Sequence, residues 1–163
     1  QPTEGKVVLG QSIKYGYFSQ NALDVLHPQS TVLEEVQNRI PNSNLGYIRN
    51  LLGAFKFSQD EADKKVQVLS GGEKSRLVLA CILACAPNFL ILDEPTNHLD
   101  MTSREVLLQA IKDFPGTVIM VSHDRHFLKS ITTKVFEVAH HELHVYQGSW
   151  DYYTSKSNGY LVR

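Results

Sequence analysis

The sequence predicts an α/β protein in which a parallel β-sheet is covered by helices on both faces and interrupted by a helical insert. Unbroken apolar stretches at residues 89–92 and 117–121 alternate with helical segments, a pattern typical of buried parallel strands. Between residues 31 and 86 the pattern is helical throughout. The sheet is therefore expected to hold an insert of about fifty residues.

Composition limits the number of domains and the kinds of partner. With 163 residues and 42% hydrophobic content, the chain is long enough for one compact domain and short for two. The net charge of −1 gives no global electrostatic argument for nucleic acid or for an anionic membrane. No apolar run approaches the roughly 20 residues that span a bilayer, and the start QPTEGKVVLG has no signal-peptide pattern. We expect a cytoplasmic protein.

Residues 5–30 are predicted to form a β-hairpin and a loop. Residues 6–9 and 13–18 are β-prone, and the Gly-Gln-Ser between them is typical of a turn. A polar stretch at residues 19–30 follows and is expected to connect the hairpin to the helical insert.

Residues 31–86 are predicted to be a helical subdomain because S/T-x-x-E capping boxes open three of its segments. In a capping box, a hydroxyl and a carboxylate satisfy backbone N–H groups that have no partner within the helix. The three pairs are Thr31 with Glu34, Ser58 with Glu61, and Ser70 with Glu73. In the last helix, Cys81 and Cys85 lie four residues apart in an apolar run, which favours reduced core side chains over a disulfide or a metal pair.

Residues 87–147 are predicted to form the rest of the sheet, and residues 148–163 a polar, aromatic tail. The expected elements are strands at 89–92 and 117–121, helices at 102–112 and from Asp124, and two further strands at 134–138 and 143–146. The helix at 102–112 is expected to open with another S/T-x-x-E pair, Thr102 and Glu105. His140 and His141 fall at the turn between the last two strands and His144 lies just after it; the three lack the H-E-x-x-H spacing, so a metal site there is not favoured.

FLILDEPTNHLD, residues 89–100, places Asp93 and Glu94 directly after a buried strand. Ligands of open parallel sheets collect at the carboxyl ends of the strands. Burying two unpaired carboxylates is costly, and a bound cation is one compensation. Capping of neighbouring helices by the two acids is an equally good interpretation of this stretch alone.

LSGGEKSR, residues 69–76, presents backbone N–H groups at a helix N-terminus. Ser70, Gly71 and Gly72 leave these groups accessible to a phosphate-sized anion. The alternative is an ordinary capping box, which stabilises the helix by about 1 kcal/mol. SHDR, residues 122–125, puts His123 after the next parallel strand, so all three stretches can converge on one edge of the sheet.

Together these motifs resemble the ATP-binding cassette (ABC) ATPase domains, which have a P-loop NTPase-type fold. LSGGE is similar to their signature loop, FLILDEP to their Walker B strand, NHLD at 97–100 to their D-loop, SHD to their switch histidine, and YFSQ at 17–20 to their Q-loop. The five motifs stand in the family's order, and the resemblance covers about residues 5–156.

Several stretches resemble one subfamily, the ABC-F proteins. These are TNHLD, SREVLLQAI, FPGTVIMVSHDRHFL and VYQGSWDYY. In addition, YFSQNALDVL followed by STVLEEV is more similar to the second ABC domain of that subfamily than to the first. ABC-F proteins carry two ABC domains in one chain, lack membrane-spanning segments and mostly act at the ribosome. The resemblance therefore implies a second ABC domain and the ribosome as partners of the full-length protein, and no membrane partner.

The resemblance also implies a role for each site residue, with ATP and Mg²⁺ as cofactors. Asp93 would hold Mg²⁺ through its water shell, and Gln20 would sense the metal and the attacking water. Glu94 would orient or deprotonate that water, and His123 would contact the γ-phosphate.

The signature and D-loop residues are expected to serve a site shared with a partner domain. Ser70, Gly71, Gly72 and Glu73 would contact a nucleotide held mainly by that domain, and Asp100 would lie at the interface between the two. Two alternatives remain: the nucleotide-binding subunit of an ABC transporter, and a non-catalytic module that completes a partner's ATP site.

The family's G-x-x-x-x-G-K-[ST] phosphate loop is not found in these residues; the only Gly-Lys pair, Gly5-Lys6, is followed by Val7. We therefore expect a partial ABC domain, truncated at its N-terminus, that alone neither binds ATP tightly nor hydrolyses it. Without the strand that precedes the phosphate loop, residues 117–121 would form an open apolar edge, which predicts self-association.

Overall fold

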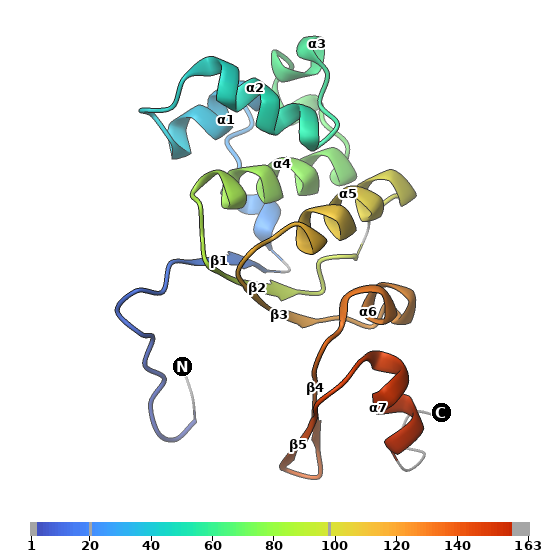
Figure 1. Cartoon of the computed structure of the whole chain (residues 1–163). Helices are drawn as coiled ribbons and strands as arrows, with labels where there is room; N and C mark the ends of the chain where they lie inside the picture. Colours follow the sequence, from blue (N-terminus) through green and yellow to red (C-terminus); the bar gives the residue numbers. More distant parts are fainter. Residues whose placement is uncertain (1–2, 20, 98, 158–163) are drawn as a thin grey trace. The chain divides into compact units, whose positions relative to one another are not determined.

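The computed structural model describes residues 3–19, 21–97 and 99–157. The chain divides into two compact units, Gln1–Val121 and Ser122–Arg163, and each unit is described by itself (Figure 1). In the described residues no helix is long and apolar enough to cross a membrane.

The first unit contains a three-stranded parallel sheet. Strands β1 (Tyr15–Phe18), β2 (Phe89–Asp93) and β3 (Thr117–Val121) lie in the order β1-β2-β3. The central strand pairs on both sides, so that Ile91 lies opposite Tyr17 on one neighbour and Ile119 on the other. The predicted parallel sheet is confirmed.

Helices α4 (Gly71–Ala84) and α5 (Met101–Lys112) cover one face of this sheet (Figure 1). Leu90 and Leu92 point toward the helices and are 3% and 1% exposed. On the opposite face Tyr15, Tyr17 and Ile119 are each about half exposed. We expected helices on both faces, and within this unit the described helices cover one.

Helix α4 is the centre of the helical subdomain. Its capping box forms as predicted, with the Glu73 N–H donating to Ser70 Oγ and the Ser70 N–H to Glu73 Oε2. Leu77 and Ala80 are fully buried because α4 lies between the sheet and helices α1 and α2 (Figure 1). The remaining elements of this region are η1 (Ala22–Val25), α1 (Val32–Arg39), α2 (Leu45–Ala54), α3 (Gln59–Ala62) and η2 (Val66–Val68).

The N-terminal hairpin prediction is wrong. Residues 6–9 form no strand, and β1 pairs in parallel with β2. The Asn88 side chain accepts from the Lys14 N–H and donates to the Ser12 carbonyl, which ties this segment to the start of β2. An isolated two-stranded hairpin is marginal in water, whereas pairing with a central strand buries Phe18 to 6% exposure.

The second unit contains helix α6 (Arg125–Ile131), the antiparallel hairpin of β4 (Val135–Ala139) and β5 (Glu142–Tyr146), and helix α7 (Trp150–Lys156). His140 and His141 occupy the hairpin turn with φ of 52° and 66°. No group of three or more His, Cys, Asp or Glu in the described residues could hold a metal ion.

A shared carboxylate joins the hairpin to α7. Glu137 accepts hydrogen bonds from the hydroxyls of Tyr146 at 3.1 Å and Tyr153 at 2.7 Å. Burial and the hydrogen bond to Glu137 raise the pKa of Tyr153 to about 12, so its hydroxyl remains a donor up to strongly alkaline pH.

Removing the Tyr153 hydroxyl should destabilise the second unit. Tyr153→Phe loses a hydrogen bond to a charged acceptor, so we expect the free energy of unfolding to fall by about 1.5–3 kcal/mol. Trp150 is the only tryptophan and its ring lies 5.2 Å from Tyr153, so its fluorescence during urea unfolding reports on this contact. The exposed Tyr152→Phe is the control; equal stability of the two variants would contradict the prediction.

Candidate functional site

The acidic pair lies at the carboxyl end of β2, where the sequence placed it. Asp93 is the last residue of the strand, and Glu94 follows with φ of 48°, a region that is unfavourable for a residue with a side chain. The Glu94 N–H donates to the Val121 carbonyl at 2.9 Å, and its carbonyl accepts from the Asn97 N–H at 3.1 Å. These backbone bonds hold Glu94, which is 8% exposed, at the end of the sheet.

Asp100 caps helix α5. Its Oδ1 accepts from the Ser103 N–H at 2.7 Å. Hydrogen bonds from the Ser103 backbone and side chain, with a smaller contribution from the charge of Arg76, hold the pKa of the Asp100 carboxyl below its usual value of 3.8. Asp100 is therefore the N-cap of α5 in the local structure.

The signature loop packs directly against Asp100. A Cβ at Gly72 would lie 2.7 Å from Asp100 Oδ2 and 3.0 Å from Ser103 Oγ, so any side chain at this position would have to displace them. At Gly71 nothing lies within 4 Å of the corresponding position. Two stretches predicted to share a site, LSGGE and NHLD, thus meet at Gly72 and Asp100.

Sequence reasoning missed Arg76, which belongs to the same cluster. Its Nη1 donates to Ser103 Oγ at 2.9 Å, and its guanidinium carbon lies 5.4 Å from the centre of the Phe57 ring. Arg76 is 7% exposed and Ser103 fully buried. The signal in the sequence was a charged residue on the apolar side of a helix, directly before the buried run LVLA.

Two predicted site residues do not enter this geometry. Gln20 lies outside the described residues. His123 stands two positions after β3, in the second unit, and is described only within that unit.

Asp93 and Glu94 fit a magnesium ion that arrives with a phosphate group. Proteins usually hold Mg²⁺ through one or two carboxylates together with substrate phosphates and several waters. The strand end supplies that number of carboxylates, Asp93 and Glu94, which is the donor type that such a site uses.

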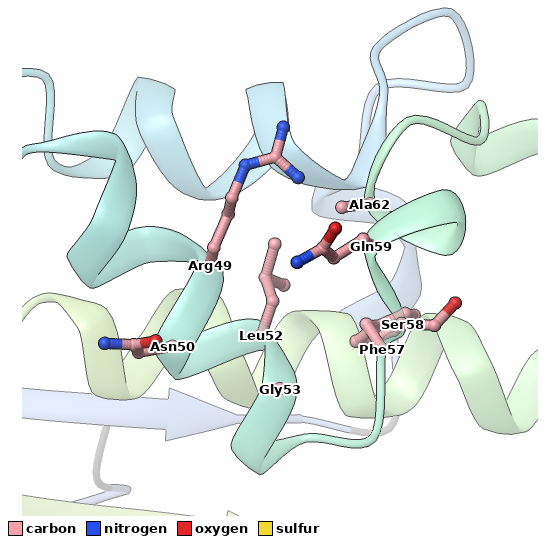
Figure 2. A pocket seen from close by; sticks show the side chains of 8 residues that line it. All are labelled: Arg49, Asn50, Leu52, Gly53, Phe57, Ser58, Gln59 and Ala62. Carbon is pink, nitrogen blue, oxygen red and sulfur yellow. The ribbon is translucent and has the colours of Figure 1, made fainter.

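The helical subdomain also contains a cavity of about 380 Å³, between α2 and α3 (Figure 2). Leu52, Phe57 and Ala62 form its apolar part, and Arg49, Asn50 and Gln59 contribute polar groups. None of the predicted site residues lines it, so its size alone does not make it the functional site.

The fold and the site together define a class: an α/β domain with a parallel sheet, an acidic pair at a strand end, and a helix whose glycine-rich start packs against the loop that follows the pair. The family model described as ABC transporter matches residues 1–97. The chain therefore belongs to the ABC transporter family of ATP-binding domains, which confirms the family predicted from the motifs.

Relatives resemble nearly the whole chain. It is 44% identical to the putative ATP-binding protein YdiF of Bacillus subtilis over 99% of its length. It is also 44% identical to ABC transporter F family member 5 of Arabidopsis thaliana over 96%, and 38% identical to the probable ATP-binding protein YheS of Escherichia coli strain K12 over 93%. The chain spans about a quarter of the length of these relatives, 25%, 23% and 24%.

Solved structures support the same fold. The ATP-binding cassette MJ0796, in a dimeric post-hydrolysis state with ADP and Pi, matches with a TM-score of 0.65 and 22% identity over 83% of this chain and 63% of that one. The cbiO1 protein of Clostridium perfringens, part of the ABC transporter complex cbiONQ, matches with a TM-score of 0.69 and 26% identity over 87% of this chain and 59% of that one.

The contact between Gly72 and Asp100 makes a testable distinction between two neighbouring glycines. Gly72→Ala should reduce the free energy of unfolding by about 1–3 kcal/mol, because the added methyl group displaces Asp100 and Ser103. Gly71→Ala, in the same helical turn but facing open space, should be neutral or slightly stabilising. Urea unfolding of both variants measures this, and equal values would contradict the packing described.

Proposed function

We propose that this chain forms part of an ABC-F protein that binds and hydrolyses ATP. The observation that carries the proposal is the packing of the signature glycine Gly72 against Asp100, in the loop that begins with the acidic pair. Relatives named as an F family member and as ATP-binding proteins support it.

The acidic pair and the histidine supply the proposed chemistry. Asp93 would hold Mg²⁺, whose charge would stabilise the phosphate groups, and Glu94 orients or deprotonates the attacking water. His123 contacts the γ-phosphate, and Gln20 senses the metal and the water. Phosphoryl transfer needs little covalent participation from the protein, so placement and charge carry the reaction.

The signature residues serve a composite site in this proposal. Ser70, Gly71, Gly72 and Glu73 contact a nucleotide held mainly by a second ABC domain, and Asp100 lies at the interface of the two domains. The start of α4 supports this because its backbone N–H groups suit an anion and Gly71 leaves open space beside them. The dimeric state of MJ0796 with ADP and Pi gives a precedent in a protein of the same fold.

For the full-length protein we propose action on the ribosome in the cytoplasm. The support is the similarity to ABC-F sequences, including ABC transporter F family member 5. A second candidate is the nucleotide-binding subunit of a transporter, because cbiO1, which is part of a transporter complex, has a similar fold. Co-purification with ribosomes or with a membrane protein distinguishes the two.

Calorimetric titration of Mg-ATP tests the nucleotide proposal. The 163 residues contain no G-x-x-x-x-G-K-[ST] loop. Without the charge-assisted hydrogen bonds of that loop, we expect this chain to bind Mg-ATP more weakly than micromolar, and a polypeptide that also supplies the loop to bind it tightly.

In an active polypeptide that contains two ABC domains, Glu94→Gln should slow ATP turnover by about 100-fold or more and leave ATP binding intact. The exposed Glu105→Gln is the control; full activity of Glu94→Gln would contradict the role proposed for this acid.

We also propose that this chain self-associates through β3. This strand lies at the edge of the sheet, and Ile119 and Val121 are 47% and 58% exposed. Open apolar edges recruit other strands, and a charge on such an edge opposes pairing. Light scattering should therefore show a concentration-dependent rise in mass that Ile119→Lys reduces, while a monomer at high concentration would contradict the proposal.

A further inference from the structure

We propose that Arg76 is a positioning residue that joins the signature loop to the loop carrying Asp100, so that the two move as one body. The inference deepens the proposed function, because these loops are the parts of the proposed nucleotide site that α4 and α5 carry. Arg76 itself is buried and serves the site only through other residues.

The first link is a hydrogen bond between helices. Arg76 lies on α4, and its Nη1 donates to the Oγ of Ser103 on α5 at 2.9 Å. The two residues are 27 positions apart in the sequence, and the strand with the acidic pair lies between them. Because Ser103 has no exposed surface, water does not compete for this bond.

The second link leads from Ser103 to the site residues. The Ser103 N–H donates to Asp100 Oδ1 at 2.7 Å, which fixes the carboxylate at the start of α5. The other carboxylate oxygen, Asp100 Oδ2, lies beside Gly72: a Cβ added at this glycine would be 2.7 Å from it. A series of contacts therefore leads from Arg76 on α4 through Ser103 and Asp100 to Gly72, which also lies on α4.

The guanidinium has a second restraint. Its carbon lies 5.4 Å from the centre of the buried Phe57 ring, a geometry suited to a cation–π contact. Arg76 Nε has no hydrogen-bond partner among the described residues. An apolar side chain would avoid the desolvation cost of this partly satisfied charge. The arginine differs from an apolar residue in fixing the relative position of the two helices by a directional bond.

The test uses amide hydrogen exchange of the 163-residue chain without nucleotide. Arg76→Met should accelerate exchange of the Ser103 amide by about tenfold or more, because loss of a buried charge-assisted bond loosens the start of α5. Amides of α1, such as that of Val36, should keep their rates. Lys112→Met removes a charge from the exposed end of α5 and should leave Ser103 unchanged.

A titration of the Asp100 carboxyl by carbon NMR gives an independent readout. The hydrogen bonds from Ser103 lower the pKa of Asp100 most, and the charge of Arg76 lowers it further. Arg76→Met should therefore raise this pKa, whereas Arg76→Lys, which retains a charge, should raise it less. If Arg76→Met does not fold, Ser103→Ala removes the same bond and should accelerate exchange at residue 103 in its place. Unchanged exchange and an unchanged Asp100 titration in folded variants would overturn the proposal.

ATP turnover separates this inference from the proposed function. In an active two-domain polypeptide, Arg76→Met should lower kcat more than it raises KM for ATP, and Arg76→Lys should recover part of the loss. If that polypeptide does not hydrolyse ATP, the proposed function fails while the exchange result still decides the role of Arg76. If the Ser103 amide exchanges faster in Arg76→Met while kcat is unchanged, Arg76 only stabilises the fold, and the positioning role is overturned.

Discussion

The burial of β2 between two parallel neighbours is the constraint on which the rest of the first unit depends. Leu92 is 1% exposed because β1 and β3 lie beside it and helices cover it from one side. The strand ends at Asp93, and the N–H of the next residue, Glu94, still donates a hydrogen bond to the Val121 carbonyl of β3. The position of both carboxylates thus follows from hydrogen bonding in the sheet.

The contact between α4 and α5 is the second determinant of the site. Both helices begin with a side-chain cap, Ser70 on α4 and Asp100 on α5, and the Asp100 cap lies against Gly72 in the first turn of α4. A methyl group at Gly72 would displace Asp100. Local capping and close packing of helices therefore act at the same place, which makes the start of α4 sensitive to changes in either loop.

Local signals predicted the helices well and one tertiary pairing poorly. The three capping boxes of the helical subdomain, at Thr31, Ser58 and Ser70, form as the S/T-x-x-E pattern indicated, since each depends on residues three apart. The pair expected at Thr102 and Glu105 does not open its helix, because Asp100 caps α5 two residues earlier. The hairpin at the N-terminus was predicted from equally local signals and is not formed. Pairing with β2, whose residues lie over seventy positions away in the sequence, stabilises Tyr15–Phe18 more than pairing with the exposed residues before it would.

The sequence by itself determined the fold class, the family and the order of the motifs, because apolar periodicity and short motifs are properties of neighbouring residues. Only the tertiary structure decided which motifs meet. Gly72 and Asp100 come together because β2 carries the chain from one helix to the next, and Arg76 joins their cluster through Ser103. An arginine in an apolar helix gives no indication of its partner, since that partner is chosen by the packing of two helices distant in sequence.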